Sequence, residues 1–382
     1  MHYNHLGKTG FSVSEIGLGC EHLQGKPYET VYAVVNAALD GGINILDVFM
    51  SEPQVRTDIG RALGARRGDV FLQGHIGSVW QDGQYQRSRD PELCRVFVGD
   101  FLDRLQTDYI DIGMIHFVDT MEDLDVVQSG GLLDYALKLK REGIIRALGF
   151  SSHNPVTARA AVEAGWADAV MFSINPAYDL LPEVEIDHYF DAKTWQRDGL
   201  SGIDPRRAAF YEACESHGVG ITVMKTYGAG FLFNPALSPF GRPMRPEQLI
   251  HYALSRPAVA SALIGCQTQQ EVASALAYET ADAQARDYAD VLGESRQFAQ
   301  TRQCVYCNHC HPCPQRIDVA QVNRCLDLAR GGEAQLAAAS AQYEALDAHG
   351  GDCIGCGACM ERCPFGVDVI ARMQDAARIF GK

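Results

Sequence analysis

Eight of the thirteen cysteines stand in two close groups near the end of the 382-residue chain. The groups are Cys304, Cys307, Cys310 and Cys313, followed by Cys353, Cys356, Cys359 and Cys363. Thiols two or three residues apart cannot pair as disulfides without severe strain, whereas they can surround an iron–sulfur cube. Each group ends in Cys-Pro, and the second has the bacterial-ferredoxin spacing C-x2-C-x2-C-x3-C-P. The spacing predicts two 4Fe–4S clusters, with zinc and inert thiols as the alternatives.

The ligands of these clusters are expected to cross between the groups. In ferredoxins of this spacing, the cysteine before proline ligates the other cluster. The expected sets are Cys304, Cys307, Cys310 and Cys363 for one cluster, and Cys353, Cys356, Cys359 and Cys313 for the other. The first group is one residue shorter before its last cysteine, which makes its geometry less regular. His309 and His311 are expected to form hydrogen bonds or face solvent rather than ligate iron.

Composition and charge narrow the class of protein. Hydrophobic residues make up 47% and charged residues 21% of the chain, which is typical of globular domains. The net charge of −15 argues against nucleic acid or an anionic membrane as a partner, and favours a basic redox partner protein. No apolar run approaches the ~18 residues of a membrane span, and the first residues lack a signal-peptide pattern. Because exposed cluster thiolates need a reducing compartment, we expect a cytoplasmic protein.

The residues before the cysteines alternate between short apolar runs and segments of helical period. The expected strands are Ile16–Gly19, Ile43–Asp47, Val70–Gly74, Ile110–Ile115, Ile145–Phe150, Ala169–Phe172, Ile221–Met224 and Ala262–Gly265. The expected helices between them include Thr30–Asp40, Pro91–Leu105, Leu132–Glu142 and Pro155–Ala164. Eight such units predict an α/β protein whose residues 1–292 form a parallel (β/α)8 TIM barrel. A doubly wound open sheet is the alternative, but no G-x-G-x-x-G follows the first strand.

Several segments lie outside this alternation. The first 14 residues contain a turn signal and predict a hairpin that closes the barrel floor. Long connections at residues 79–90 and 177–204 leave carboxyl ends of strands, and the second could be a lid or a packed surface loop. After residue 292 the alternation stops. Residues 293–382 are therefore expected to form a ferredoxin-like domain, with helical segments at Val319–Leu328 and Glu333–Leu346.

Titratable residues follow the expected strands. TIM-barrel enzymes keep their chemistry at the carboxyl ends of the strands. Asp47 ends the second strand, and His75 and His116 follow the third and fourth. Two histidines on adjacent strands beside a carboxylate indicate acid–base chemistry. Cys20 and Cys266, after the first and eighth strands, are expected to be small buried residues, with a redox-active pair as the alternative.

Several motifs extend over nearly the whole chain. They include Leu6-Gly-Lys-Thr-Gly10, Gly42-Ile-Asn-Ile-Leu-Asp47, Gly149-Phe-Ser-Ser-His-Asn-Pro155 and Met224-Lys-Thr-Tyr-Gly-Ala-Gly-Phe-Leu232. With these motifs and the cysteine groups, the chain resembles aldo/keto reductases that carry a carboxy-terminal 4Fe–4S ferredoxin domain. The resemblance implies NAD(P)H-linked reduction of a carbonyl, or oxidation of an alcohol, on a small molecule.

The chain departs from the catalytic set of that family, which is Asp, Tyr, Lys and His. Asp47 matches the aspartate and His116 the histidine. Glu52 stands where the family has its tyrosine, and His75 where it has its lysine. We therefore expect His116 and His75 to form the acid–base pair, with Asp47 orienting them. Glu52 is expected in a secondary acid–base role, with a solvated loop carboxylate as the alternative.

The resemblance also places the nicotinamide cofactor. The positions it implies are Ser151, Ser152, Asn175, Met224, Lys225, Gly228, Gly230 and Gly265. Ser151 matches a serine that contacts the nicotinamide amide, while Met171 stands where the family has a glutamine with the same role. NAD(P) is thus an expectation of the resemblance alone.

These observations favour an iron–sulfur oxidoreductase that acts on a carbonyl or hydroxyl group of a small molecule, sugar-like or other. Electrons would pass through the clusters and possibly through NAD(P)H. The alternatives are a cluster-bearing lyase or isomerase, and a non-catalytic electron-transfer or regulatory subunit. Loss of the tyrosine and lysine favours the alternatives, whereas retention of Asp47 and His116 favours catalysis.

Overall fold

The computed structural model describes residues 1–180, 203–294, 302–331, 333–363 and 365–382. The chain forms two compact units. The first contains Met1–Ile174, His217–Thr226 and Ala258–Ala281, and the second contains Asn175–Ser216, Tyr227–Pro257 and Asp282–Lys382. The predicted domain boundary at residue 292 remains a prediction. Most of the expected lid at 177–204 falls outside the described residues.

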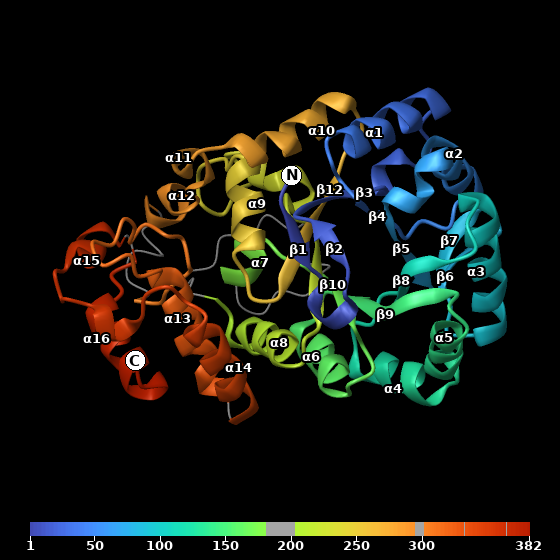
Figure 1. The fold of residues 1–382 in the computed structure, drawn as a ribbon. Coiled ribbons are helices and arrows are strands. Elements are labelled where there is room, and N and C mark those ends of the chain that lie inside the picture. The colour runs from blue at the N-terminus through green and yellow to red at the C-terminus, as the bar shows by residue number, and fades with distance from the viewer. Residues whose placement is uncertain (181–202, 295–301, 332, 364) are drawn as a thin grey trace. The chain divides into compact units, whose positions relative to one another are not determined.

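The first unit contains a closed barrel of eight parallel strands, as predicted (Figure 1). The strands are β3 (Ile16–Gly19), β4 (Ile45–Val48), β5 (Phe71–Ile76), β8 (Ile110–Ile115), β9 (Ile145–Ser152), β10 (Ala169–Ser173), β11 (Gly220–Met224) and β12 (Val259–Gly265). They neighbour one another in the order β10-β11-β12-β3-β4-β5-β8-β9. All eight coincide with expected strands to within a few residues, because apolar runs that are buried on both faces define their middles.

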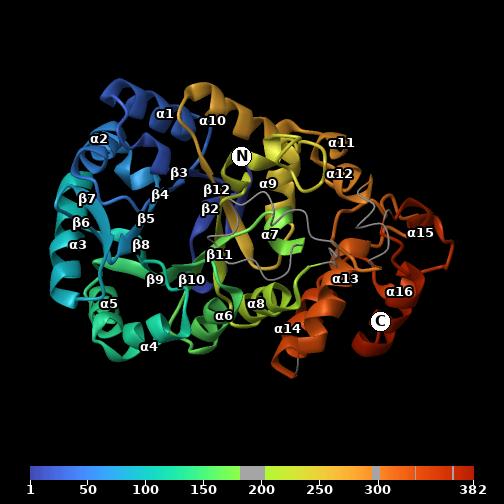
Figure 2. The same cartoon turned by 180° about the vertical axis from the view of Figure 1, so that it is seen from behind.

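Helices of the first unit lie around the outside of the strands (Figure 2). They are α1 (Tyr28–Asp40), α2 (Pro53–Leu63), α3 (Pro91–Leu105), α4 (Met121–Ser129), α5 (Leu132–Arg141), α6 (Pro155–Glu163) and α10 (Gln269–Leu276). Proline occupies the first turn of α2, α3 and α6, where its missing N–H has no helical partner to lose. The side chains of Asp90 and Asn154 cap α3 and α6 by accepting backbone N–H bonds.

The amino-terminal hairpin closes the barrel floor, as expected. Strands β1 (Tyr3–His5) and β2 (Ser12–Ser14) pair antiparallel, and Leu6 and Val13 beside them are fully buried. Both belong to an apolar cluster that includes Ile45, Ala169 and Ala260. These three residues lie at the starts of their strands. The opposite, carboxyl ends of the strands therefore remain for polar side chains.

A short hairpin follows β5, where the sequence indicated only a long connection. Strands β6 (Ser78–Gln81) and β7 (Gln84–Arg87) pair antiparallel. Asp82 and Gly83 connect them, with φ angles of 52° and 74°. Two positive φ values in an Asp-Gly pair are the mark of a tight two-residue hairpin turn. This turn sets the side of the hairpin on which Tyr85 lies.

The second unit is helical in the part that the structure describes. Its helices are α7 (Pro176–Leu180), α8 (Pro205–Ser216), α9 (Pro246–Leu254), α11 (Ala283–Arg286), α12 (Ala289–Glu294), α13 (Val319–Leu328), α14 (Glu333–Glu344), α15 (Ala358–Arg362) and α16 (Val369–Phe380). Helix α13 packs against α14 and α16 (Figure 1). Helices α13 and α14 match the two expected helical segments between the cysteine groups. No helix among the described residues has the length and apolar character needed to cross a membrane.

Candidate active site and cysteine cavities

Three of the four predicted catalytic side chains meet at the carboxyl ends of neighbouring strands. Asp47 lies on β4, His75 on the adjacent β5, and His116 directly after the next strand, β8. His75 Nε2 is 3.0 Å from Asp47 Oδ1, and His75 Nδ1 is 2.8 Å from His116 Nδ1. All three residues are at least nine-tenths buried. Their catalytic role remains a prediction.

The Asp47 carboxylate has a second donor. Gln73, opposite Asp47 in the sheet register, donates its Nε2–H to the same Oδ1 at 2.7 Å. The Oε1 of Gln73 in turn accepts a hydrogen bond from Thr222 Oγ1 at 3.0 Å. Asp47 is thus held by two side chains of β5, and Gln73 is fixed from the far side of the barrel.

Tyr85 joins this group from the β6–β7 hairpin. Its hydroxyl lies 2.6 Å from Nε2 of His116. Phe49 stacks on the His116 ring, with centroids 5.6 Å apart and planes 7° from parallel, and meets Tyr85 edge to face. Tyr85 was not among the residues predicted from the sequence, because it does not directly follow a strand of the barrel. The Asp82-Gly83 pair was the signal that could have revealed the hairpin.

Burial shifts the pKa values of the His116 ring and the Tyr85 phenol. It lowers the pKa of His116 well below its ordinary value, and the nearby His75, Arg89, His153 and Arg87 lower this pKa further. Burial also raises the pKa of Tyr85, against the opposing effect of Arg87 and Arg89. A neutral imidazole and a neutral phenol are therefore favoured near neutral pH.

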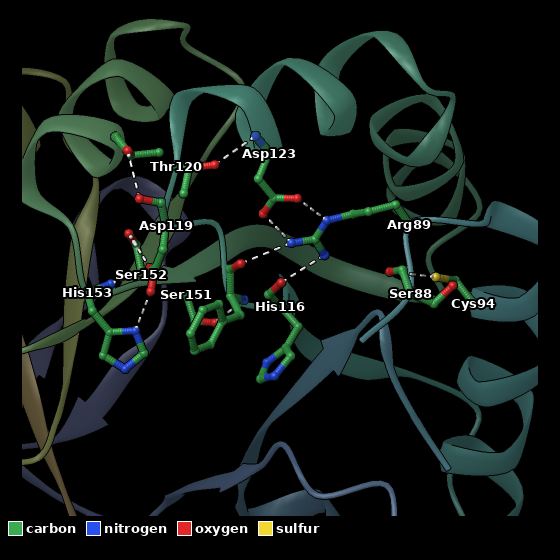
Figure 3. Close-up of polar contacts among 12 residues, drawn as sticks. Ser88, Arg89, Cys94, His116, Asp119, Thr120, Asp123, Ser151, Ser152 and His153 are labelled. Carbon is green, nitrogen blue, oxygen red and sulfur yellow. Dashed lines mark hydrogen bonds and ion pairs between the residues drawn. The ribbon is translucent and has the colours of Figure 1, made fainter. Parts of the chain in front are cut away.

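Arg89 fixes the backbone that carries His116 (Figure 3). Its Nη1 donates to the carbonyl oxygen of His116 at 2.9 Å, and its Nη2 to that of Phe117 at 3.0 Å. Asp123 holds the other side of the guanidinium with two bonds, of 2.7 and 2.5 Å. Phe117 has a positive φ of 57°. The arginine thus stabilises a tight turn after β8 and keeps the His116 ring in position.

The two predicted cofactor serines are the last two residues of the neighbouring strand β9 (Figure 3). Ser151 Oγ accepts a hydrogen bond from the backbone N–H of Phe117 at 2.8 Å. Ser152 Oγ donates to Asp119 at 3.0 Å, and Asp119 also pairs with the His153 ring at 2.9 Å. Both serines are buried. Their contact with a nicotinamide stays a prediction.

Three further predicted cofactor positions lie in the first unit. Met224 ends β11 and packs against the apolar cluster inside the barrel. Lys225 has a positive φ of 59°, and burial lowers its pKa. Gly265 ends β12, where an added Cβ would meet the ring of His22 at 2.5 Å. A larger residue therefore cannot replace this glycine without displacing His22.

The other three predicted cofactor positions lie in the second unit. Asn175 is buried, and its Oδ1 accepts a bond from the backbone N–H of Tyr178 at 3.0 Å. Gly228 and Gly230 have φ angles of 56° and 87°, which non-glycine residues rarely adopt. The backbone conformation alone therefore accounts for glycine at these two positions.

Glu52 has a structural role that was not predicted from the sequence. Its carboxylate caps α2, with Oε1 accepting from the N–H of Gln54 at 3.0 Å and Oε2 from that of Val55 at 2.6 Å. Neither bond connects Glu52 to the histidines.

The two cysteines at the strand ends are both buried. Burial raises the pKa of Cys20 well above its ordinary value, and Asp47 and Cys266 raise it further. Burial also raises the pKa of Cys266 to about 12. Both thiols are therefore protonated near neutral pH, as expected of small buried residues.

The eight cysteines that were predicted to ligate the clusters line two cavities of the second unit. We define the first cysteine cavity by Cys304, Cys307, Cys310 and Cys363, and the second by Cys313, Cys353, Cys356 and Cys359. They enclose about 330 and 380 Å³ of empty space, openings included. Each cavity thus takes three thiols from one sequence group and the fourth from the other. Among the described residues, no three or more His, Cys, Asp or Glu side chains converge as ligands of a single ion.

The two cavities differ in exposure. Burial raises the pKa of Cys304, Cys307 and Cys310 to about 12 in the first, whereas Cys356 in the second is exposed. The histidines of the first sequence group pair with carboxylates: His309 lies 3.0 Å from Asp287 and His311 3.6 Å from Asp318. The first cavity is therefore the more sheltered of the two.

Comparison with known proteins gives both sequence and fold relatives. The sequence model of the aldo/keto reductase family matches residues 15–247. The oxidoreductase YqkF of Bacillus subtilis is 30% identical over 182 residues, which are 47% of this chain and 57% of that protein. The NADH-specific methylglyoxal reductase of Escherichia coli is 27% identical over 186 residues, which are 43% and 56%. The chain thus spans little more than half the length of these curated relatives.

Solved structures show the same fold. An aldo-keto reductase from Bacillus halodurans in its holo form superposes with a TM-score of 0.61 at 22% identity, over 79% of this chain and 100% of that one. An aldo-keto reductase of Pseudomonas aeruginosa superposes with a TM-score of 0.55 at the same identity, over 72% and 95%.

Proposed function

Because the chain belongs to the aldo/keto reductase family, we propose that it is an oxidoreductase that interconverts a carbonyl and a hydroxyl group on a small molecule. The hydrogen-bonded series Asp47–His75–His116 at the carboxyl ends of neighbouring strands carries this proposal. Reduction of a carbonyl adds two electrons and two protons. The buried histidines offer a route for the proton that reaches the oxygen.

The hydrogen bonds fix where protons sit in the histidine pair. The Asp47 carboxylate can only accept, so Nε2 of His75 carries a proton. In neutral His75 the other nitrogen accepts, and Nδ1 of His116 must then donate to it. One added proton makes His75 an imidazolium beside Asp47, and the bond between the rings reverses. The pair can therefore hold one proton and release it.

The fit to a nicotinamide is partial. This cofactor, when bound, supplies hydride to the carbonyl carbon. Ser151 still has its own hydroxyl hydrogen to donate, since its oxygen is the acceptor for Phe117. Met171 stands where the second amide partner of the nicotinamide is expected, and it packs in the apolar cluster inside the barrel. We therefore derive no step through the nicotinamide.

The lining of the two cysteine cavities is the evidence from which we propose two 4Fe–4S clusters. Four thiols around one cavity form a complete ligand set for such a cluster. A 4Fe–4S cluster, when bound, exchanges one electron at a time, so two clusters carry the two electrons that the reaction needs. A redox partner protein would supply or remove these electrons.

Iron analysis of a double variant tests both the clusters and their crossed ligands. Protein purified without oxygen should contain about eight irons per chain. In the crossed arrangement, Cys304 and Cys363 serve the same cluster. Cys304→Ala/Cys363→Ala should therefore keep about four irons, whereas ligation within each sequence group would leave close to none.

Cys325 provides the matched control. It is buried in α13 and lines neither cavity. Cys325→Ala should therefore keep the wild-type iron content. Wild-type protein without iron, even after reconstitution with iron and sulfide, would contradict the clusters.

Turnover without oxygen tests the reaction class. The probe is methylglyoxal, a substrate named for one relative, offered with NADH, NADPH or reduced methyl viologen. Loss of absorbance at 340 nm would show nicotinamide oxidation, and loss of the viologen colour alone would show single-electron donors. Conversion of the probe without either change would indicate a lyase or isomerase, and no conversion would contradict the proposal.

A further inference from the structure

Tyr85 is the outermost member of a continuous hydrogen-bonded series. The series runs Tyr85–His116–His75–Asp47, with separations of 2.6, 2.8 and 3.0 Å. Tyr85 is 40% exposed, whereas the other three residues are at most 6% exposed. Of these four side chains, the phenol is therefore the one that a substrate can reach while it remains bonded to the buried rings.

The series has two arrangements that differ by one proton. In the neutral arrangement, Tyr85 donates to His116 Nε2, His116 Nδ1 donates to His75, and His75 Nε2 donates to Asp47. In the charged arrangement, His75 carries both ring protons beside the Asp47 carboxylate. His75 then donates to His116, His116 donates to the phenol oxygen, and the phenol hydrogen is free to point away. Only the charged arrangement presents a donor to a substrate.

The groups around the phenol favour this role. Burial raises the pKa of Tyr85, so a free phenolate is disfavoured. The cations Arg87 and Arg89 oppose that effect, and His153 faces His116 from the neighbouring loop. Burial lowers the pKa of His116, so this ring passes a proton on more readily than it keeps one. The proton that leaves the phenol is therefore replaced from His116, and no lysine is needed to stabilise a phenolate.

The position of this tyrosine differs from the position that the resemblance implied. The residue five positions after Asp47 is Glu52, which caps α2. The phenol instead reaches the site from the hairpin after β5. Resting on the proposed function, we propose that Tyr85 is the catalytic acid that protonates the carbonyl oxygen, supplied by a proton relay through His116 and His75.

The step balances in atoms and charge. The O–H bond of Tyr85 breaks as a new O–H bond forms on the substrate oxygen. The Nε2–H of His116 passes to the phenol oxygen, and the Nδ1–H of His75 passes to His116 Nδ1. The relay ends neutral after one proton has reached the substrate oxygen. The carbon would receive its hydrogen and the two electrons together as a hydride, which a bound nicotinamide would supply. In alcohol oxidation the same three protons move in the opposite direction.

Tyr85→Phe removes only the hydroxyl, and Tyr32→Phe is its matched control. Tyr32 lies on α1 and is 50% exposed. With methylglyoxal and whichever donor the wild type accepts, Tyr85→Phe should lower kcat by ~10²-fold or more, the effect of losing a general acid. Tyr32→Phe should match the wild type. Iron content and circular dichroism of both variants should equal those of the wild type.

Nitrogen-15 NMR of histidine-labelled protein gives a readout that needs no turnover. In the wild type, His116 Nε2 accepts the phenol hydrogen at neutral pH, and Tyr85→Phe should shift this signal more than the signals of exposed histidines.

The outcomes are distinct. Near-wild-type turnover by folded, iron-loaded Tyr85→Phe, or an unchanged His116 spectrum, would overturn the role of Tyr85 and leave the proposed function standing. A wild type that converts neither methylglyoxal nor the corresponding alcohol would overturn the proposed function together with this inference.

Discussion

The exchange of lysine for histidine at position 75 changes the kind of proton that the site can handle. A lysine beside a tyrosine acts as a fixed positive charge, whereas imidazole gains and loses its proton near neutrality and has two nitrogens that can do so. In this chain both ring nitrogens of His75 have partners, Asp47 on one side and His116 on the other. The residue is therefore placed to conduct a proton rather than only to stabilise a charge.

Removal of either ring should interrupt this conduction. His75→Gln and His116→Gln keep a hydrogen-bonding side chain of similar size but cannot pass a proton from one nitrogen to another. Each should lower kcat by ~10²-fold or more, as expected for lost general acid–base catalysis. Steady-state turnover of the iron-loaded variants with methylglyoxal measures the effect.

His5→Gln is the control for these variants. His5 lies on β1 at the barrel floor and is exposed, so its replacement should leave turnover unchanged. Wild-type rates in both His75→Gln and His116→Gln would mean that the rings only pack the barrel mouth.

At the scale of elements, the site residues that could be predicted from the sequence are those placed by the parallel strands of the barrel. Residues that follow neighbouring parallel strands meet at one edge of the barrel, so Asp47, His75 and His116 were identifiable from apolar runs alone. Tyr85 was not, because its place depends on how the β6–β7 hairpin folds back over the strand ends. Most residues of that hairpin are polar, and its apolar side chains are too few to show the direction in which it folds.

The two crossed sets of cysteines could likewise be predicted from their spacing, since the cysteine before proline leaves the turn that holds the other three.

The capping role of Glu52 could not be predicted in this way. Glutamate is outside the small group of residues that commonly cap helices, and its carboxylate lies over the first turn of α2 instead of pointing to the histidines.

A helix-capping role and an acid–base role for Glu52 predict different results when this residue is replaced. As a cap, Glu52 satisfies two free N–H groups of α2, and Glu52→Ala should lower the free energy of unfolding by about 1 kcal/mol. Turnover at a temperature where the variant is folded should stay close to that of the wild type. Thermal unfolding and steady-state kinetics on the same preparation separate the two effects.

Glu92→Ala serves as the reference for this change. The Glu92 side chain is 77% exposed and pairs only with Arg95, one turn away on α3 among the residues described, so its loss should have little effect on stability or turnover. A fall in kcat of ~10²-fold in Glu52→Ala, without a matching loss of folded protein, would instead assign Glu52 to the chemistry.

At the scale of the whole molecule, charge bears on the electron partner. The chain carries a net charge of −15 and a sequence pI near 5.2. The second cysteine cavity contains the exposed Cys356, and Ile354 and Met360 nearby are 63% and 37% exposed. A cluster there would exchange electrons with a partner more readily than one in the sheltered first cavity.

An acidic protein of this charge should associate faster with a basic partner, and salt should weaken the attraction. We therefore expect that oxidation of the dithionite-reduced protein by ferricytochrome c, a basic protein, slows as ionic strength rises from about 0.01 to 0.15 M, over which the Debye length falls from about 30 to 8 Å. Ferricyanide, an anionic oxidant, should show the opposite trend, because salt screens its repulsion from the chain. Stopped-flow absorbance of the proposed clusters, recorded without oxygen, measures both rates. The same salt dependence for the two oxidants would mean that net charge does not steer the encounter, and that the surface around the second cysteine cavity alone selects the partner.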